Sequence, residues 1–378
     1  MKYLSLDVFK DFECIGSDCP DTCCAGWAVI VDCKSFEEYD NTPGEFGDKL
    51  RANMFEKDMC HYMKLDEDKR CPFLNKNNLC EIYINLGKDK MCLTCQNYPR
   101  IIKTVGDVIF YKLNISCPVV AGKILGRKEK IVFDFVEQEG TNPGETDWPL
   151  FNTLISGFTT SIDIMQDRNL SLSDRLGLIV ILNDMLRENI WSGRDCSEII
   201  DSFQNSRFAG YIEKMKNIKS DPLVKLNFIT DFVGSLSETN GVDGIASLLD
   251  DLYGVLKSER DIGKTAEIIC RPLADMDDIM YEQYSVYFLF TYYMEAYESH
   301  DPLEYVAVLV YLLCIQNCFC AVRATDGQKP ATDVCVDVFV KIARFYEHSR
   351  NSYRMHNLYR LNNNQGSEYT DFLLSLVK

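Results

Sequence analysis

The distribution of cysteine constrains the fold of this chain more than any other feature of its sequence. The chain has 17 cysteines in 378 residues, and eleven of them lie between residues 14 and 117. The eleven are Cys14, Cys19, Cys23, Cys24, Cys33, Cys60, Cys71, Cys80, Cys92, Cys95 and Cys117; the other six are Cys196, Cys270, Cys314, Cys318, Cys320 and Cys335. The six are interpreted as ordinary buried thiols of a protein core. The N-terminal third is therefore a distinct, cysteine-dense module.

The sequence favours metal binding over disulfide formation in this module. The opening residues MKYLSLD lack the apolar segment and the small-residue cleavage site of a secretory signal peptide, so we expect a cytoplasmic protein. Thiols stay reduced in the cytoplasm, where clustered cysteines are typically metal ligands or catalytic groups. The odd total also suits a disulfide framework poorly. With four histidines (His61, His300, His348 and His356), a histidine-rich metal site is not expected, and each is interpreted as a solvated or core residue.

Composition and charge exclude several classes of protein. The hydrophobic content of 46% and aromatic content of 12% predict a globular chain rather than a disordered one. The net charge of −17 disfavours a nucleic-acid partner, which would select a basic surface. One apolar run, Tyr305–Ile315, is too short to span a membrane and is followed by Gln316 and Asn317. We therefore expect a central core helix there, and no membrane partner.

The coarse pattern predicts a mainly α protein, in which a small irregular α+β cysteine-rich module is followed by an all-helical domain. The polar stretch 137–148, rich in Gly, Pro and Asn, is interpreted as the linker, giving domains 1–136 and 149–378. Helical spacing, with an S-x-x-D start at Ser171, predicts a helix over 172–186. Further helices are predicted over 223–236, 245–256, 281–297, 305–322 and 334–348, and short strands over 26–32 and 105–115.

Nine of the cysteines form an ordered series of motifs. The series runs C-x4-C-x3-CC from Cys14 followed by a Trp, CPFL from Cys71, LCEI around Cys80, C-x2-C-x2-YPR from Cys92, and SCP around Cys117. Tight spacings of this kind let one loop wrap a metal centre with several thiolates. The series resembles the flagellin lysine N-methylase (FliB-type) family, within a wider group of cysteine-rich proteins described as zinc- or iron-chelating. The motifs cover residues 14–118, about a third of the chain.

The resemblance implies methyl transfer from S-adenosylmethionine to lysine side chains of flagellin, with a [4Fe-4S] cluster in the cysteine module. The cysteines that match the family pattern, and are thus the predicted metal ligands, are Cys14, Cys19, Cys23, Cys24, Cys71, Cys80, Cys92, Cys95 and Cys117. One cubane cluster takes four thiolates, so either five have other roles or a second metal is present. Cys33 and Cys60 fall outside the pattern.

The mechanism stays open at this point. The radical-enzyme signature C-x3-C-x2-C is absent, and so is the glycine-rich strand–loop–helix fingerprint of a Rossmann-type methyltransferase. Direct displacement requires a lysine to lose a proton whose pKa is about 10.4. A carboxylate or tyrosinate can accept this proton, and aromatic faces attract the cations involved.

Three residues are candidates for the chemistry of the site. Tyr98, in the YPR motif, and Tyr284, in the tyrosine-rich stretch 281–297, are the predicted catalytic residues. A packed amphipathic helix is the alternative interpretation of that stretch. Arg100 is predicted to bind the carboxylate of S-adenosylmethionine through a bidentate contact, with a structural turn as the alternative. The alternative function is that of a non-catalytic metal-binding or adaptor protein that holds structural zinc. Iron with labile sulfide in the purified protein would favour the methyltransferase over this alternative.

Overall fold

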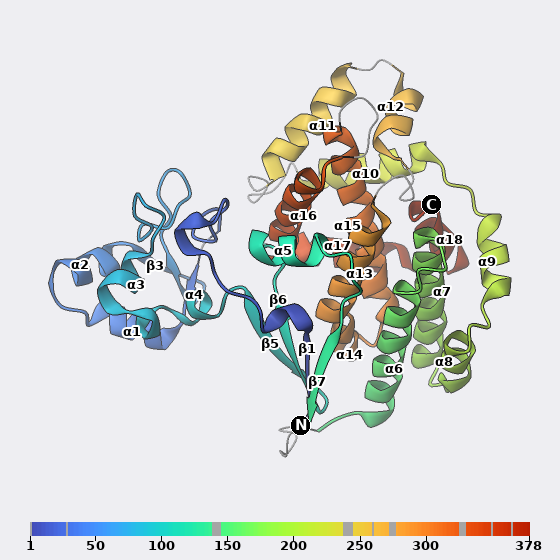
Figure 1. Cartoon of the computed structure of the whole chain (residues 1–378), viewed down its shortest axis with the longest axis horizontal. Coiled ribbons are helices and arrows are strands. Elements are labelled where there is room, and N and C mark those ends of the chain that lie inside the picture. The colour runs from blue at the N-terminus through green and yellow to red at the C-terminus, as the bar shows by residue number, and fades with distance from the viewer. Residues whose placement is uncertain are drawn as a thin grey trace.

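The computed structural model describes residues 2–27, 29–137, 145–236, 245–258, 261–271, 277–324, 330–348, 351–363 and 366–378. The described part is mainly α-helical with two small sheets, which confirms the predicted fold class. Figure 1 shows a large helical lobe and a small lobe formed by residues 13–99. The small lobe is inserted between two strands of the sheet that borders the large lobe.

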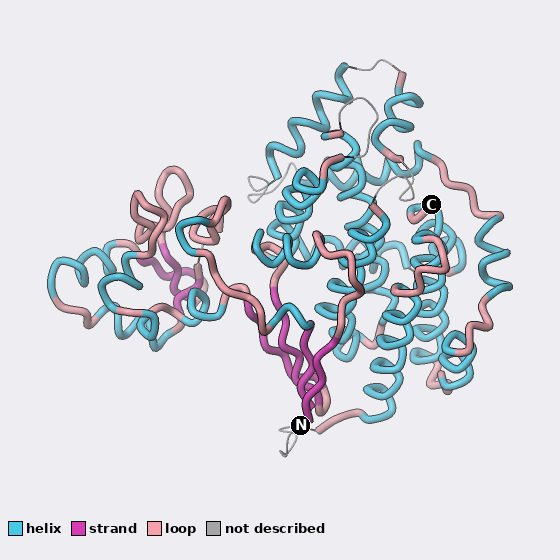
Figure 2. The backbone as a smooth tube through the Cα atoms, in the orientation of Figure 1, coloured by secondary structure: helices cyan, strands magenta, loops and turns pink. Residues whose placement is uncertain are grey.

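That sheet has four strands, in the order β5-β6-β1-β7. They are β1 (Lys2–Leu6), β5 (Arg100–Val105), β6 (Val108–Leu113) and β7 (Phe133–Glu137). β1 runs parallel to β6, with Lys2 opposite Val108, and antiparallel to β7. The single strand predicted over 105–115 is wrong in one respect: Gly106, at φ 58°, turns the chain between β5 and β6. Figure 2 shows these strands gathered beside the helical lobe.

The small lobe has its own elements and its own core. Its elements are β2 (Ile30–Val31), α1 (Cys33–Asp40), α2 (Gly44–Ala52), β3 (Met54–Lys57), β4 (Cys60–Met63), α3 (Glu81–Leu86) and α4 (Leu93–Asn97). α1 begins at Asp32, whose side chain accepts a hydrogen bond from the Ser35 amide at 3.0 Å. The core contains Val29, Val31, Tyr39, Leu50, Met63, Phe73, Ile82 and Cys92. Of the strand predicted over 26–32, only residues 30–31 pair, and Ala28 lies outside the described residues.

The large lobe follows the sheet with α5 and a long series of helices. They are α5 (Pro118–Leu125), α6 (Trp148–Met165), α7 (Leu172–Trp191), α8 (Ser197–Gln204), α9 (Ala209–Lys216), α10 (Pro222–Leu236), α11 (Ala246–Ser258), α12 (Ile262–Ile269), α13 (Asp278–Tyr292), α14 (Ala296–Ser299), α15 (Pro302–Arg323), α16 (Thr332–Glu347), α17 (Asn351–Asn362) and α18 (Ser367–Leu376). α7 begins where the sequence predicts, because the Ser171 hydroxyl accepts from the Asp174 amide at 3.1 Å.

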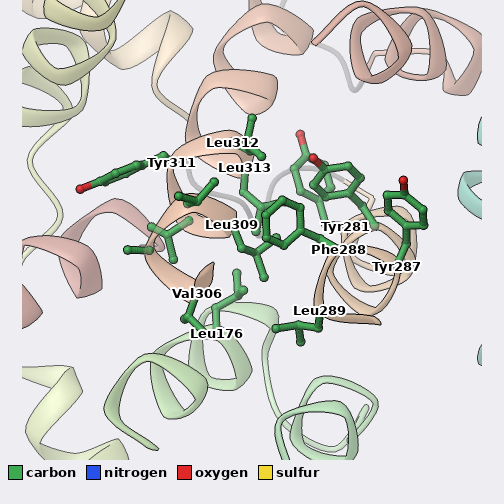
Figure 3. Close-up of a cluster of buried hydrophobic side chains, with 14 of the residues drawn as sticks. Leu176, Tyr281, Tyr287, Phe288, Leu289, Val306, Leu309, Tyr311, Leu312 and Leu313 are labelled. Atoms are coloured by element: carbon green, nitrogen blue, oxygen red, sulfur yellow. The ribbon is translucent and has the colours of Figure 1, made fainter. Parts of the chain in front are cut away.

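α15 is the central helix of this lobe. It is long and apolar enough to cross a membrane, but 89% of its most apolar window is buried inside the protein. Leu309 and Leu312 on α15 face Phe288 on α13, and Leu176 on α7 closes the cluster (Figure 3). The prediction of a core helix over 305–322 is therefore confirmed.

The core of the large lobe also includes the four-stranded sheet. Phe110 on β6 packs on Phe290 of α13 with ring centroids 5.9 Å apart, and both belong to one continuous core with Leu309. Residues 138–144, within the predicted linker, lie outside the described residues. The division at residues 136 and 149 stays a prediction, while the small lobe has a separate core.

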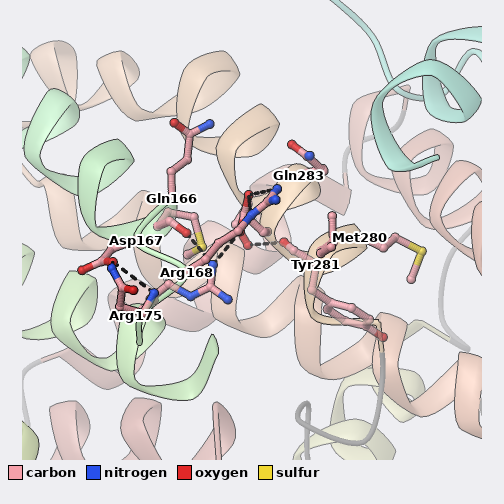
Figure 4. Close-up of polar contacts among 12 residues, drawn as sticks. Gln166, Asp167, Arg168, Arg175, Met280, Tyr281 and Gln283 are labelled. Atoms are coloured by element: carbon pink, nitrogen blue, oxygen red, sulfur yellow. Dashed lines mark hydrogen bonds and ion pairs between the residues drawn. The ribbon is translucent and has the colours of Figure 1, made fainter. Parts of the chain in front are cut away.

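A buried ion network ties α13 to the helices before it (Figure 4). Glu282 has no exposed surface and accepts from Arg175 Nη1 at 2.7 Å and from Arg168 Nη2 at 2.9 Å. Arg175 is itself buried and also donates to the Met165 carbonyl at 2.7 Å. The network holds the turn between α6 and α7 against α13. Glu282 on α13 lies 107 residues after Arg175 in the chain.

Candidate functional site

The nine predicted metal ligands fall into two sets, and all seventeen cysteines of the chain are free thiols. We call the first set the junction thiols, Cys14, Cys19, Cys23 and Cys117. We call the second the lobe thiols, Cys24, Cys71, Cys80, Cys92 and Cys95. The first set lies where the small lobe meets α16, and the second lies within the small lobe.

Arg344 on α16 holds the two parts of the junction thiols together. Its Nη2 donates to the Asp21 carbonyl at 3.0 Å, its Nε donates to the Ser116 carbonyl at 3.2 Å, and its Nη1 pairs with the Asp21 carboxylate at 2.7 Å. Cys19 Sγ donates to the same Asp21 carbonyl at 3.3 Å, and Cys117 directly follows Ser116. Burial raises the pKa of Cys117, and the nearby thiols of Cys19 and Cys14 raise it further.

Backbone contacts gather the lobe thiols. The Cys71 amide donates to the Cys24 carbonyl at 2.7 Å, and Cys80 pairs with Leu74 in an isolated β-bridge. Cys92 precedes α4 and Cys95 lies in it, and both contact the small-lobe core, as do Cys71 and Cys80. Burial raises the pKa of Cys71 to about 12, and the thiols of Cys24, Cys80 and Cys92 add to the effect.

The donor chemistry of both sets suits a metal that prefers thiolate. Within the described residues, however, no three His, Cys, Asp or Glu side chains are arranged to hold a metal ion. Cys33 and Cys60 are exposed and belong to neither set. Metal binding at the nine cysteines therefore stays a prediction, carried by donor type and grouping.

An aromatic group adjoins the junction thiols. Trp27 stacks on His348, with ring centroids 4.6 Å apart and planes at 19°, and Tyr98 packs obliquely on both rings at 5.8 and 5.7 Å. Trp27 Nε1 donates to the Cys23 carbonyl at 2.7 Å. All three rings are partly exposed. We call Trp27, Tyr98 and His348 the aromatic junction.

A chain of hydrogen bonds crosses this junction. The Tyr98 hydroxyl lies 3.1 Å from Ser116 Oγ, which lies 2.8 Å from His348 Nε2. Burial lowers the pKa of His348 to about 4, with a contribution from the Arg344 charge, so its imidazole is neutral near pH 7. Burial raises the pKa of Tyr98, so its phenol is also neutral there. The chain therefore joins three neutral groups, each able to pass on a proton.

A network of hydrogen bonds around the Glu347 carboxylate adjoins this hydrogen-bonded chain. Glu347 accepts from the hydroxyls of Tyr287 and Tyr292 at 2.9 and 3.0 Å and from the Ser116 amide at 3.2 Å. Burial raises the pKa of Glu347. Asn114 Oδ1 is buried with no hydrogen-bond partner among the described residues, although the backbone of Asn114 is hydrogen-bonded to Pro99 and Cys117. A buried acceptor in this state costs about 1–3 kcal/mol, which a bound donor would recover.

The three predicted chemistry-bearing residues occupy different places. Tyr98 lies in the aromatic junction. Tyr284 is buried in the helical core, where its ring centroid lies 4.9 Å from that of Phe339. Arg100 Nη2 donates to the Phe12 carbonyl at 2.8 Å, and the guanidinium lies over the Phe12 ring. The catalytic roles and the cofactor contact stay predictions.

Sequence reasoning gave no role to Ser116, Glu347 or His348. Ser116 lies in the SCP motif, and this motif is the sequence feature that could have indicated a role for it. Glu347 and His348 end a predicted helix and meet Ser116 across more than two hundred residues. The spacing of residues in the sequence does not predict contacts between positions so far apart.

Comparisons with known proteins place the chain in one family. Residues 159–376, more than half of the chain, match the family described as the FliB lysine N-methylase C-terminal domain. A match of 121 residues, 28% identical, relates the chain to a protein named lysine-N-methylase from Salmonella typhimurium and covers 30% of each. A match of 120 residues, also 28% identical, relates it to the flagellar biosynthetic protein FliU of Salmonella muenchen, covering 30% of this chain and 71% of that protein. The matched segment thus spans about 30% of the length of the lysine-N-methylase. No solved structure matches the chain.

Proposed function

The chain belongs to the FliB lysine N-methylase family, and on this premise we propose that it transfers methyl groups from S-adenosylmethionine to lysine side chains of flagellin, in the cytoplasm. Two relatives support the substrate class through their names, lysine-N-methylase and flagellar biosynthetic protein. The observation that carries the proposal is the aromatic junction, where an aromatic group and a hydrogen-bonded chain of neutral groups adjoin the family's cysteine motifs.

The reaction sets three requirements for the protein. The lysine must lose a proton, its Nζ lone pair must reach the methyl carbon, and the electron pair of the broken C–S bond must stay on sulfur. S-adenosylmethionine supplies the electrophilic methyl group. Deprotonation is the hardest requirement at neutral pH, because the ordinary pKa of lysine is about 10.4.

The surface of the aromatic junction can help a bound lysine to lose its proton. Trp27 and Tyr98 present π faces that attract an ammonium or sulfonium cation. Their partial burial removes water from a bound lysine, which lowers the lysine pKa and favours its neutral form. Neither ring carries a charge that would oppose a cation.

The hydrogen-bonded chain can carry the released proton away. The Tyr98 oxygen accepts it while the Tyr98 hydroxyl proton passes to Ser116, and the Ser116 proton passes to His348 Nε2. Because burial lowers the pKa of His348 to about 4, the imidazole is neutral near pH 7, so its Nε2 is free to accept the proton while the ring passes one on to solvent. Glu347 is a positioning residue here, since it fixes the Ser116 backbone.

We also propose that junction thiols hold the [4Fe-4S] cluster that the family resemblance implies, with zinc as the alternative metal. Four thiols are the number that one such cluster takes. Arg100 remains our candidate for the carboxylate of S-adenosylmethionine. The proton path from lysine to His348 does not involve the cluster.

The experiment measures methyl transfer from labelled S-adenosylmethionine to flagellin by anaerobically purified protein. Tyr98→Phe keeps the ring face and removes the proton path, so kcat should fall about 100-fold with little change in KM. Tyr83→Phe, at a tyrosine that is 54% exposed on α3, is the matched control and should keep full activity.

Two outcomes would contradict the proposal. Full activity in Tyr98→Phe would exclude the proton path. If the intact protein, with its metal bound, transfers no methyl group, the non-catalytic metal-binding or adaptor function is the better account.

A further inference from the structure

We propose that the free edge of β5 is the docking site for the substrate, where an extended, lysine-bearing segment of flagellin pairs as an added strand and brings its lysine to the aromatic junction. This inference rests on the proposed function and names the surface that would recognise the substrate. Figure 1 shows β5 at the border of the sheet, on the side of the small lobe. The flagellin segment would extend the sheet by one strand.

β5 has a strand on one side and an open edge on the other. It pairs with β6 along its whole length, and no other strand among the described residues lies along it. A turn of two residues joins the two strands, and the residues that flank such a turn, here Val105 and Val108, are a hydrogen-bonded pair of the ladder. The alternation of the ladder then directs the amides and carbonyls of Ile102 and Thr104 away from β6. A further strand could bond these groups.

The side chains of β5 do not protect this edge from pairing. Ile102 is 63% exposed and Ile101 is 40% exposed. Proteins commonly guard an exposed edge with proline or with a charged side chain, lysine above all. β5 contains no proline, and its one lysine, Lys103, pairs with Glu295 and Glu298 of the helical lobe. An apolar edge without such protection is typical of a surface that binds another strand.

The edge leads directly to the aromatic junction. The Asn114 amide donates to the Pro99 carbonyl at 2.8 Å, so the contact between the two chain segments continues one residue beyond β5. Tyr98 is the next residue, and its ring belongs to the aromatic junction. Because an added strand advances in step with β5, a substrate residue placed beside Ile102 would lie about four positions from a lysine placed at Tyr98.

The charge beside the start of β5 suits a cationic segment. Asp11 and Glu13 are exposed, and neither forms an ion pair with another described residue. They flank Phe12, whose carbonyl accepts from Nη2 of Arg100, the first residue of β5, at 2.8 Å. The two carboxylates would attract a lysine-bearing segment. A second copy of this chain, with its net charge of −17, is a poorer partner for this edge.

Pairing through the main chain also suits a substrate that has more than one target lysine. The hydrogen bonds of an added strand do not depend on the identity of its side chains. Selection would come from an apolar or β-branched residue that packs beside Ile102. Different lysines could then reach Tyr98, provided that each lies about four positions from such a residue.

The test compares binding and turnover in the full-length protein purified without oxygen. Ile102→Arg places a cation on the edge, and Thr104→Pro removes an outward amide while leaving the ladder with β6 in place. Val136→Arg, on the opposite edge strand β7, is the matched control, because this valine is also exposed, at 43%. Fluorescence anisotropy measures flagellin binding, labelled S-adenosylmethionine measures methyl transfer, and hydrogen exchange measures backbone protection. Circular dichroism reports whether each variant is folded.

We expect both edge variants to raise the Kd and the KM for flagellin about 10-fold or more, with kcat unchanged, because each weakens several hydrogen bonds of the added strand. Val136→Arg should match the parent protein. The amides of residues 100–105 should exchange several-fold more slowly when flagellin is bound, whereas those of residues 133–137 should not change.

Other results would overturn the proposal. Parent-like binding by both folded edge variants would show that flagellin docks elsewhere. An equal loss of binding in Val136→Arg would show a general effect of added charge. Concentration-dependent dimers of the parent protein that Ile102→Arg abolishes would assign the edge to a second copy of this chain. Protection of β5 by flagellin without methyl transfer would reject the proposed function alone.

Discussion

Glu347 and His348 are adjacent residues whose ionisation is shifted in opposite directions by the same burial. The pKa of Glu347 is raised and that of His348 is lowered to about 4, because burial disfavours the charged form of each. Both residues are hydrogen-bonded to Ser116, Glu347 through the Ser116 amide and His348 through the Ser116 hydroxyl.

The shift at His348 predicts a pH dependence of stability. Because the unfolded imidazole protonates near its ordinary pKa of about 6.5 and the folded one near 4, the stabilisation is complete above pH 6.5 and is lost as the pH falls toward 4. In His348→Phe, urea unfolding should lose less stability over that window, by about 3 kcal/mol. Identical pH profiles of the two proteins would contradict this.

The buried Glu282 predicts a large effect from a small substitution. Glu282→Gln removes the charge that Arg168 and Arg175 share and leaves buried Arg175 without a countercharge. We expect a loss of about 3–5 kcal/mol in the free energy of unfolding, measured by urea denaturation. Glu213→Gln, in an exposed pair with Lys216, is the control and should cost less than about 1 kcal/mol. A similar cost for both variants would exclude a special role for the network.

At the scale of elements, local sequence signals located helices well and strands poorly. Ser171 caps α7 as predicted, and the 305–322 pattern found α15, because caps and helical periodicity act within one or two turns. The strand predicted over 105–115 corresponds to β6, whereas β5 was not predicted, since the turn at Gly106 has few residues to mark it. Pairing of β1 with β6 depends on residues about a hundred positions apart, which no local pattern reports.

Close packing of α6 gives a prediction at this scale. A Cβ added at Gly157 would lie 2.5 Å from Tyr293 Oη and 2.8 Å from Leu186 Cδ1. Gly157→Ala should therefore destabilise the protein by about 1–3 kcal/mol in urea denaturation. Gly254→Ala, inside α11 with open space around it, should instead stabilise by about 0.5–1 kcal/mol. Equal effects at the two positions would refute the packing argument.

At the scale of the whole molecule, the sequence predicted the family and the mainly helical class of the chain. It could not predict that α16 forms one wall of the candidate site. Arg344, Glu347 and His348 reach Asp21 and Ser116 from the far end of the chain. Such contacts depend on how the two lobes pack together, and they cannot be predicted from a single sequence.

The contacts of Arg344 predict how firmly the small lobe is held. Arg344→Gln removes its ion pair with Asp21 and weakens its hold on two loops. We expect limited proteolysis within residues 13–99 to become several-fold faster, while the urea midpoint of the helical lobe changes little. Arg207→Gln, at an exposed ion pair with Asp201, should behave like the parent protein. Unchanged cleavage in Arg344→Gln would mean that other contacts hold the lobe.

The insertion of the small lobe between β1 and β5 also sets an order of events during synthesis. β1 leaves the ribosome before the small lobe, yet both of its sheet partners, β6 and β7, are made after it. The small lobe, with its separate core, can thus fold before β1 has a sheet partner. Folding of the small lobe would then precede closure of the sheet, and a substitution that unfolds this lobe would affect the nascent chain before β1 has been paired.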